Sequence, residues 1–459
     1  MAQKKKEFFL FNWILPSSDD NNNRGFFRIV TLVLILALIV DTMINYVVDF
    51  LVSSITTGWG IAAFISIFVI FGTGQYFILD YIKRKSKEIR LKYVSFRMML
   101  IIVTLAQHSV LIIAAILVLQ ILLASYFFTG MLIIGYTISH ILTIALSALA
   151  SFWLLSWYKS NRSSIAVLLY GIFFIVYAFS TTVVTAEHLI VLSEKEPVRS
   201  AKSEVIFPTF KPGTILKGLS NTYHTFDTVS FIIVWLATVT LLYHYSQKLG
   251  RTTFWFLISL PLAYFLSTFV NIIGIYSPTT EQAQFYFYLY ISLNSTAGGV
   301  LFAVAFRAVA QSLQKSATRD YMIIAALGFI LTFISNQPNL MLATYPPFGF
   351  ATSSISGLSA FLILIGLYSS AVSVSQDSKL RQSIKKIATK DVDLLSSIGT
   401  AQMEQEIQRT VNSMKNVVEE QEKELEEQTG IEANLGEDEM KNYLEEVMQE
   451  IGKVKKPSI

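Results

Sequence analysis

Ten long apolar segments run through this chain of 459 residues and restrict its fold more than any other feature. Hydrophobic residues make up 53% of the chain, and the mean hydropathy is +0.53. A soluble protein cannot bury that much apolar surface, whereas a helix of about 20 apolar residues crosses the hydrocarbon core of a bilayer. Because lipid offers no partners for backbone N–H and C=O groups, such segments must be helical. We place the spans at 26–49, 60–82, 98–120, 130–157, 164–186, 229–247, 254–276, 285–307, 321–337 and 353–374.

Lys and Arg fall on alternate sides of these segments. They cluster before the first span, after the second, fourth, sixth and eighth spans, and in the tail that follows the tenth. The short loops on the other side contain neither residue, at 50–59, 121–129, 277–284 and 338–352. Basic residues are retained in short cytoplasmic loops. We therefore predict a multi-pass protein of the plasma membrane with both termini in the cytoplasm.

These patterns divide the chain into four parts. The segment 187–228 carries both charge signs, and we predict it as a longer outer loop because such loops cross the membrane despite their charge. The fold class is an all-α, polytopic helical membrane bundle with a cytoplasmic helical or coiled-coil tail. The predicted parts are a cytoplasmic segment 1–25, a ten-helix transmembrane domain 26–374 with that outer loop, a helical or coiled-coil segment 375–428, and an acidic helix 429–459.

The tail is acidic, with 12 Lys and Arg against 18 Asp and Glu over 375–459. An apolar seam repeats at heptad spacing in Ile407, Val411, Met414, Val418, Gln421 and Leu425. Heptads indicate a coiled coil, and we predict a break at Gly399, between this seam and another nearer the membrane. A homo-oligomer contact or a docking site for a cytoplasmic protein through 400–451 is one interpretation. A partly disordered tail is the other, since short isolated helices are barely stable.

Composition excludes several classes of chemistry. The chain has no Cys, so it has no disulfide, thiolate metal site or cysteine nucleophile. No catalytic or nucleotide-binding motif occurs, which favours a protein that is not an enzyme, and we assign no catalytic residue, cofactor or metal ligand. No Arg-rich stripe with interleaved aromatic residues points to nucleic acid. The predicted surroundings are the lipid bilayer.

Polar residues inside the predicted spans are the candidate functional residues, because such groups are costly in lipid. Asp41, His108 and His140 together suggest a proton relay or a cation site. Hydrogen bonding between helices, worth about 0.6 kcal/mol on average, is the interpretation we prefer. The candidates are Asp41, Gln107, His108, His140, Asn271 and Asn294.

Other polar and aromatic groups lie near predicted span ends. Glu187 and His188 are expected to snorkel toward the headgroups. Trp153 and Trp157 are expected at the membrane interface. The turn-rich segment 336–350 is expected in the outer interface, with the capping of a cavity as the alternative.

The segment from Gln337 to Gly349, QPNLMLATYPPFG, and the later Tyr368-Ser369-Ser370 and 373–378 resemble uncharacterised multi-pass membrane proteins of ammonia-oxidising archaea. The resemblance covers the last spans and the start of the tail. It implies a multi-pass membrane protein and no particular activity.

Three functions follow from these observations. The first is a sensor or scaffold, in which the tenth helix continues into the tail and passes on a shift of the bundle. The second is a secondary transporter of ions or small solutes, since ten spans can form a 5+5 inverted architecture. The third is an intramembrane enzyme or redox subunit. We favour them in that order.

Overall fold

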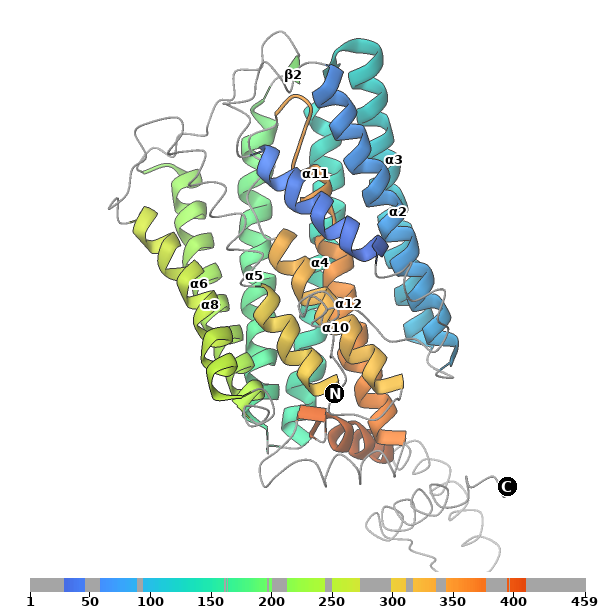
Figure 1. Cartoon of the computed structure of the whole chain (residues 1–459), viewed down its shortest axis with the longest axis vertical. Helices are drawn as coiled ribbons and strands as arrows, with labels where there is room; N and C mark the ends of the chain where they lie inside the picture. Colours follow the sequence, from blue (N-terminus) through green and yellow to red (C-terminus); the bar gives the residue numbers. More distant parts are fainter. Residues whose placement is uncertain are drawn as a thin grey trace, which may run out of the picture.

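A computed structural model gives the structure of the chain. It describes residues 29–45, 58–88, 94–160, 162, 164–195, 198–199, 213–243, 250–272, 299–310, 317–335, 344–376, 394–395 and 397–409. Within these ranges the chain is almost entirely helical, which confirms the all-α class (Figure 1). Apolar runs bounded by charged or turn-forming residues account for the helices, since backbone groups in lipid must pair within their own segment.

Seven helical stretches of the described residues are long and apolar enough to span a membrane. They comprise α2 (Gly58–Glu88), α3 (Val94–Ala124), α4 (Thr129–Ser160), α5 (Ile165–Ser193), α6 (Ile215–Tyr243), α10 (Ala317–Ser335), and α11 (Phe350–Ser354) with α12 (Ser356–Gln376). The chain is therefore an integral membrane protein. The other three predicted spans correspond to Ile29–Asn45, α8 (Arg251–Ile272) and Gly299–Ala310, and ten spans remain a prediction.

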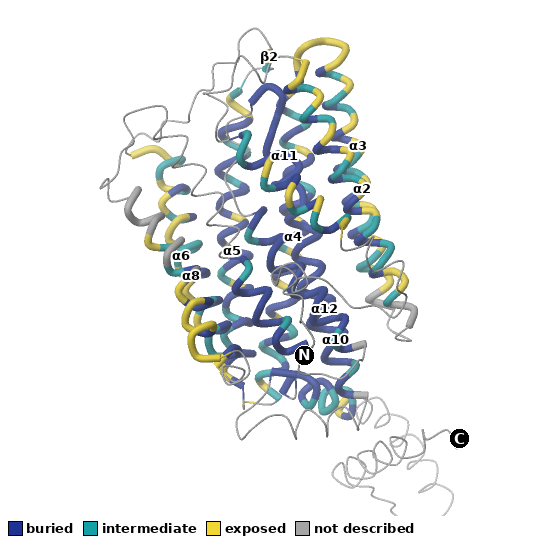
Figure 2. The backbone as a smooth tube through the Cα atoms, viewed as in Figure 1, coloured by how far each residue is buried: buried dark blue, intermediate teal, exposed yellow. Residues whose placement is uncertain are grey.

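Helix α4 occupies the centre of the bundle, in contact with α3, α5 and α12 (Figure 1). Helix α10 packs along α12, while α6 packs on α5 and contacts α8. The segment Ile29–Asn45 crosses the bundle obliquely beside α11. Figure 2 shows α10 and α12 buried along their length, whereas many residues of α2 and α3 are exposed. The exposed stripe of α3 is apolar, as expected of a surface that faces lipid, and includes Ile101, Leu105, Ile112 and Leu119.

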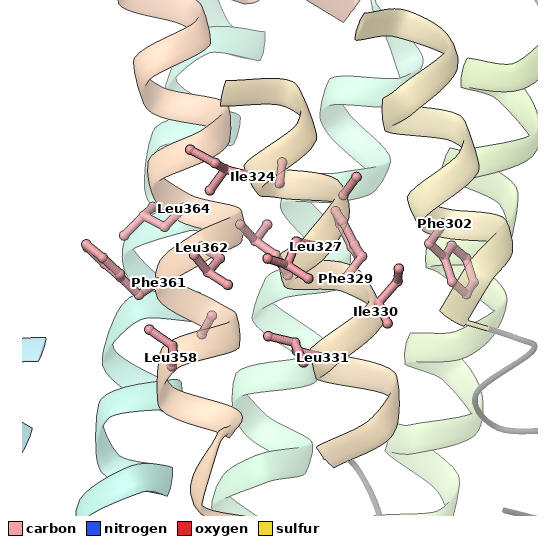
Figure 3. Packing of buried hydrophobic residues seen from close by; sticks show 14 of the residues in the cluster. Phe302, Ile324, Leu327, Phe329, Ile330, Leu331, Leu358, Phe361, Leu362 and Leu364 are labelled. Atoms are coloured by element: carbon pink, nitrogen blue, oxygen red, sulfur yellow. The ribbon is translucent and has the colours of Figure 1, made fainter. Parts of the chain in front are cut away.

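Small residues bring α10 and α12 into close contact. Aliphatic side chains from the two helices meet between them, among them Leu327, Leu331, Leu358 and Leu362 (Figure 3). At Gly366 of α12, a Cβ atom would lie only 2.6 Å from the carbonyl oxygen of Tyr321. Such spacing lets helix backbones approach closely in a membrane.

A short antiparallel pair joins two connections at one end of the bundle, here called the β1–β2 end. Strands β1 (Tyr126–Phe127) and β2 (Val198–Arg199) pair with Tyr126 opposite Arg199. The predicted outer loop 187–228 is too long, because α5 continues to Ser193 and α6 already begins at Ile215. The residues 187–193 are mostly apolar, and the Pro-Gly pair before Thr214 marks where α6 starts.

The described part of the tail lies at the opposite end of the bundle, here called the tail end. Residues 394–395 and a helix over 397–409 lie across it (Figure 1). Trp157 of α4 donates its indole N–H to the side-chain oxygen of Gln402 at 2.9 Å. The amide nitrogen of Gln405 lies 2.7 Å from Ser156 Oγ. Trp157 is therefore buried against the tail, and the predicted interface position is wrong for this residue.

Helix 397–409 runs through Gly399 without the predicted break. A Cβ atom at Gly399 would lie 2.3 Å from Cγ1 of Val374 on α12. The glycine thus permits close contact between the tail helix and α12, and does not end a helix. Leu394, Leu395, Ile398 and Ala401 complete the contact as part of the main core. The heptad residues after Arg409 lie outside the described residues.

Candidate functional site

The helix formed by α11 and α12 is interrupted at Ile355, in the middle of the bundle. Ser139 of α4 inserts its hydroxyl at this point. The hydroxyl donates to the carbonyl oxygen of Ser354 at 2.8 Å and accepts the N–H of Gly357 at 3.2 Å. Side chains that insert in this way are a recognised cause of helix breaks, and they satisfy backbone groups that lipid cannot. Ser139 Oγ also lies 3.0 Å from Ser356 Oγ.

Asp41 caps the start of α11 from a helix that is 308 residues away in sequence. One carboxylate oxygen accepts the N–H of Gly349 at 2.9 Å. The other accepts the N–H of Thr352 at 3.0 Å and its hydroxyl at 2.8 Å. A carboxylate at a helix N-terminus pairs with free N–H groups and favours the helix dipole. Asp41 is fully buried, so these three donors compensate its loss of water.

The segment 344–349, which leads into α11, is inserted among the helices. Tyr345 and Phe348 are 2% and 1% exposed, so the predicted outer-interface position is wrong for this part of 336–350. Phe348 meets Phe64 of α2 edge to face at 5.5 Å, and Tyr345 stacks on Phe127. These aromatic contacts provide the apolar burial that the turn-rich sequence alone does not indicate. Burial also raises the pKa of the Tyr345 phenol.

A second group of buried polar side chains lies between α4 and α5, nearer the β1–β2 end. It comprises Tyr136, His140, Glu187 and His188 and is called the α4–α5 cluster. The Tyr136 ring stacks on both imidazoles, with centroids 3.7 Å from His140 and 4.8 Å from His188. Glu187 and His188 are 2% and 1% exposed, so snorkelling is wrong for both. They lie within α5 and not at its end, which explains the error.

Hydrogen bonding fixes how each imidazole of the cluster is protonated. Nδ1 of His140 lies 3.1 Å from the carbonyl oxygen of Tyr136, and Nδ1 of His188 lies 2.7 Å from that of Val184. Because a carbonyl oxygen only accepts, each Nδ1 carries hydrogen, and Nε2 of the neutral ring keeps its lone pair. His188 Nε2 and Glu187 Oε2 are buried and have no partner among the described residues.

Two side chains of α6, one neutral and one charged, interact with Glu187. The side chain of Ser220 hydrogen-bonds to Glu187, and the ammonium group of Lys217 attracts it. Lys195 lies just after α5, at the β1–β2 end of the bundle. The Thr129 hydroxyl donates to its carbonyl oxygen at 3.3 Å. Burial lowers the pKa of the Lys195 ammonium group to about 8.

The structure separates the residues that the sequence grouped into a relay. Asp41 lies at α11 and His140 in the α4–α5 cluster. His108 is exposed on the apolar stripe of α3, where it donates to the carbonyl oxygen of Thr104 at 2.7 Å. No hydrogen bond joins these three side chains in the part of the chain that the structure describes.

The remaining candidates are Gln107, Asn271 and Asn294. Gln107 is buried in α3, and both of its amide atoms lack a partner among the described residues. Asn271 belongs to α8, but its side chain lies outside what the structure describes, as does all of Asn294.

Sequence reasoning missed Ser139, Glu187 and His188. For the last two a signal existed, because the apolar run of the fifth span continues past His188 to Leu192. Extending that span places both residues inside it, where ionisable groups are functional candidates by default. For Ser139 no local signal distinguishes it from other hydroxyl residues in the spans.

Comparisons with known proteins identify no relative: no family model, no curated protein and no solved structure matches the chain. Chemistry must therefore be argued from the two sites. Among the described residues, no group of three or more His, Cys, Asp or Glu side chains is arranged to hold a metal ion.

Proposed function

We propose that this integral membrane protein is a sensor or scaffold that couples its helical bundle to a cytoplasmic tail. The observation that carries the proposal is the contact of helix 397–409 with both α4 and α12 at the tail end. The same two helices meet through Ser139 at the interruption, deep in the bundle. A shift of α4 against α12 at that point therefore moves the surface on which the tail rests.

The packing of the tail helix suits the transmission of such a shift. Polar contacts from Gln402 and Gln405 fix its position on α4, while the close contact at Gly399 fixes it on α12. Packed interfaces of this kind exchange between discrete arrangements and do not deform continuously. Orientation in the plasma membrane, cytoplasmic termini, a coiled coil beyond 409 and kinship with the archaeal proteins belong to the proposal as well.

The coupling is tested with a spin label on the tail helix of the full chain in nanodiscs. Because the chain has no Cys, Glu404→Cys gives a single labelling site. We expect Ser139→Ala, which leaves the Ser354 carbonyl and the Gly357 N–H without this partner, to increase label mobility at 404. Ser66→Ala is the matched control, since its hydroxyl bonds only within α2 and is exposed. Equal mobility at 404 in Ser139→Ala and in the control contradicts the proposal.

A secondary transporter is the second candidate, and one observation favours it. Transporters bind ions where a membrane helix is broken and polar groups face the gap. Beside the interruption, the hydroxyls of Ser353 and Ser354 are buried without a partner among the described residues. Na⁺ serves as the probe: a transporter of this kind should melt several degrees higher in sodium chloride than in choline chloride, and Asp41→Asn should abolish the difference. Equal melting of the wild-type chain in both salts speaks against this function.

A further inference from the structure

We propose that the α4–α5 cluster binds one exchangeable proton inside the bundle. The inference rests on the positions of Tyr136, His140, Glu187 and His188, and it holds whether the protein signals or transports. It assigns a ligand, the proton, to side chains that neither the interruption nor the tail contact uses.

The first argument is the nature of the two atoms without partners. His188 Nε2 and Glu187 Oε2 are neighbours in sequence, both are buried, and both can only accept hydrogen when deprotonated. Buried acceptors without donors are costly, and native structures almost always satisfy them. A proton on Glu187 replaces a buried negative charge by a neutral carboxyl group, which costs far less to bury. The burial of Glu187 thus favours a bound proton.

The second argument is charge. When the imidazoles are neutral and the Glu187 carboxylate is ionised, the cluster carries one negative charge in a buried place. One added proton on the Glu187 carboxylate makes the cluster neutral, as a carboxylic acid. Uptake forms one O–H bond, and hydronium from the aqueous side supplies the proton.

The surroundings place the cluster near one end of the bundle and supply a response to proton loss. Glu187 lies six residues, or about 9 Å along the helix, before the end of α5, and its side chain bonds to Ser220 of α6. Lys217 offsets part of the charge when the proton leaves. The other ionisable groups near the cluster are Tyr177 of α5, which acts on Tyr136, and Asp227 of α6, which acts on Tyr177.

Alternative occupants fit less well. A metal ion needs at least three ligands in a compact arrangement, and the described residues form no such group. The Tyr136 ring fills the space against both imidazoles, with centroid distances of 3.7 and 4.8 Å, which leaves no room for a planar ligand on the stacked faces. A proton requires no volume.

The proton site adjoins the interruption through α4. His140 follows Ser139 directly, and Tyr136 lies one turn before it. A change in the charge of the cluster therefore occurs next to the helix turn whose hydroxyl fills the break between α11 and α12.

The test follows protonation in the full chain in nanodiscs between about pH 4.5 and 9. The chain has five His residues, so ¹⁵N-labelled His reports each imidazole, and isotope-edited infrared spectra report carboxylic acids. We expect the two signals together to show one proton bound per chain within the cluster. Glu187→Gln should abolish this uptake. His108→Gln, on the exposed stripe of α3, is the control and should leave it unchanged.

Two outcomes overturn the proposal. In the first, His140, His188 and Glu187 keep the same state across the whole range, as expected if the unpartnered atoms hold only a water molecule. In the second, Glu187→Gln takes up the proton as the wild type does. If Glu187→Gln does not fold, the infrared spectrum of the wild-type chain decides. The proposal is then overturned if no Glu carboxylic acid signal changes with pH.

Discussion

Asp41→Ala is expected to lower the free energy of unfolding by about 2–4 kcal/mol, because it leaves three buried donors without their acceptor. These are the N–H groups of Gly349 and Thr352 and the Thr352 hydroxyl. The hydroxyl has a remaining acceptor in the carbonyl oxygen of Leu38 at 3.0 Å, but the two N–H groups at the start of α11 do not gain one. Reversible unfolding in mixed micelles, followed by tryptophan fluorescence, measures the change.

Two further variants test whether the loss of stability comes from the hydrogen bonds that Asp41 accepts at the start of α11. Asp41→Asn keeps one oxygen acceptor but turns an NH₂ group toward the N–H donors, so its cost should approach that of the alanine variant. Asp80→Asn is the control, since its partner Arg84 is 71% exposed and surface ion pairs contribute about 0–1 kcal/mol. A loss in Asp41→Ala no larger than in Asp80→Asn would show that the cap does not stabilise the fold.

The sequence predicts the helices well where an apolar run has clear limits. The fourth span was placed at 130–157, and α4 covers Thr129–Ser160. Apolar length and the internal pairing of backbone groups are sufficient for this, because they are local properties. The same reasoning identified Asp41 and His140 as unusual, since a polar group in a span is visible without knowledge of its partners.

Partners could not be predicted, because they come from distant parts of the chain. Nothing near Asp41 indicates that its carboxylate meets Gly349 and Thr352. Pro and Gly in 344–349 indicate a turn but not its depth, which is set by packing of Phe348 against Phe64. At Gly399 the sequence predicted a helix break, and only the position of Val374 shows that this glycine permits a close contact between helices.

Helix α4 connects the features that local sequence could not relate. Tyr136 and His140 belong to the α4–α5 cluster, and Ser139 fills the interruption. About five turns further along, Trp157 bonds to Gln402 of the tail helix. A rigid helix with polar contacts along its length can carry a displacement between them, whereas α2 and α3 expose apolar side chains on their outer faces. Variants along α4 should therefore affect the tail more than variants on α3.

The second large effect is expected at the contact of α10 with α12. Gly366→Ala places a methyl group 2.6 Å from the carbonyl oxygen of Tyr321 and 2.7 Å from the backbone nitrogen of Ala325. Backbone atoms cannot move aside as a flexible side chain can, so the two helices must separate. Overpacking of this kind costs roughly 2–3 kcal/mol, and the same micelle unfolding experiment measures it.

Gly218→Ala is the matched control for this prediction. Gly218 lies in α6, and a Cβ atom there meets nothing within 4 Å. Alanine is a better helix former than glycine, so this variant should be neutral or gain up to about 1 kcal/mol. The two substitutions are chemically identical. Changes of opposite sign in the free energy of unfolding therefore isolate the contact between α10 and α12. If Gly366→Ala is also neutral, the two helices do not approach as closely as Gly366 allows. The packing that supports α12 must then come from its other neighbours, chiefly α4.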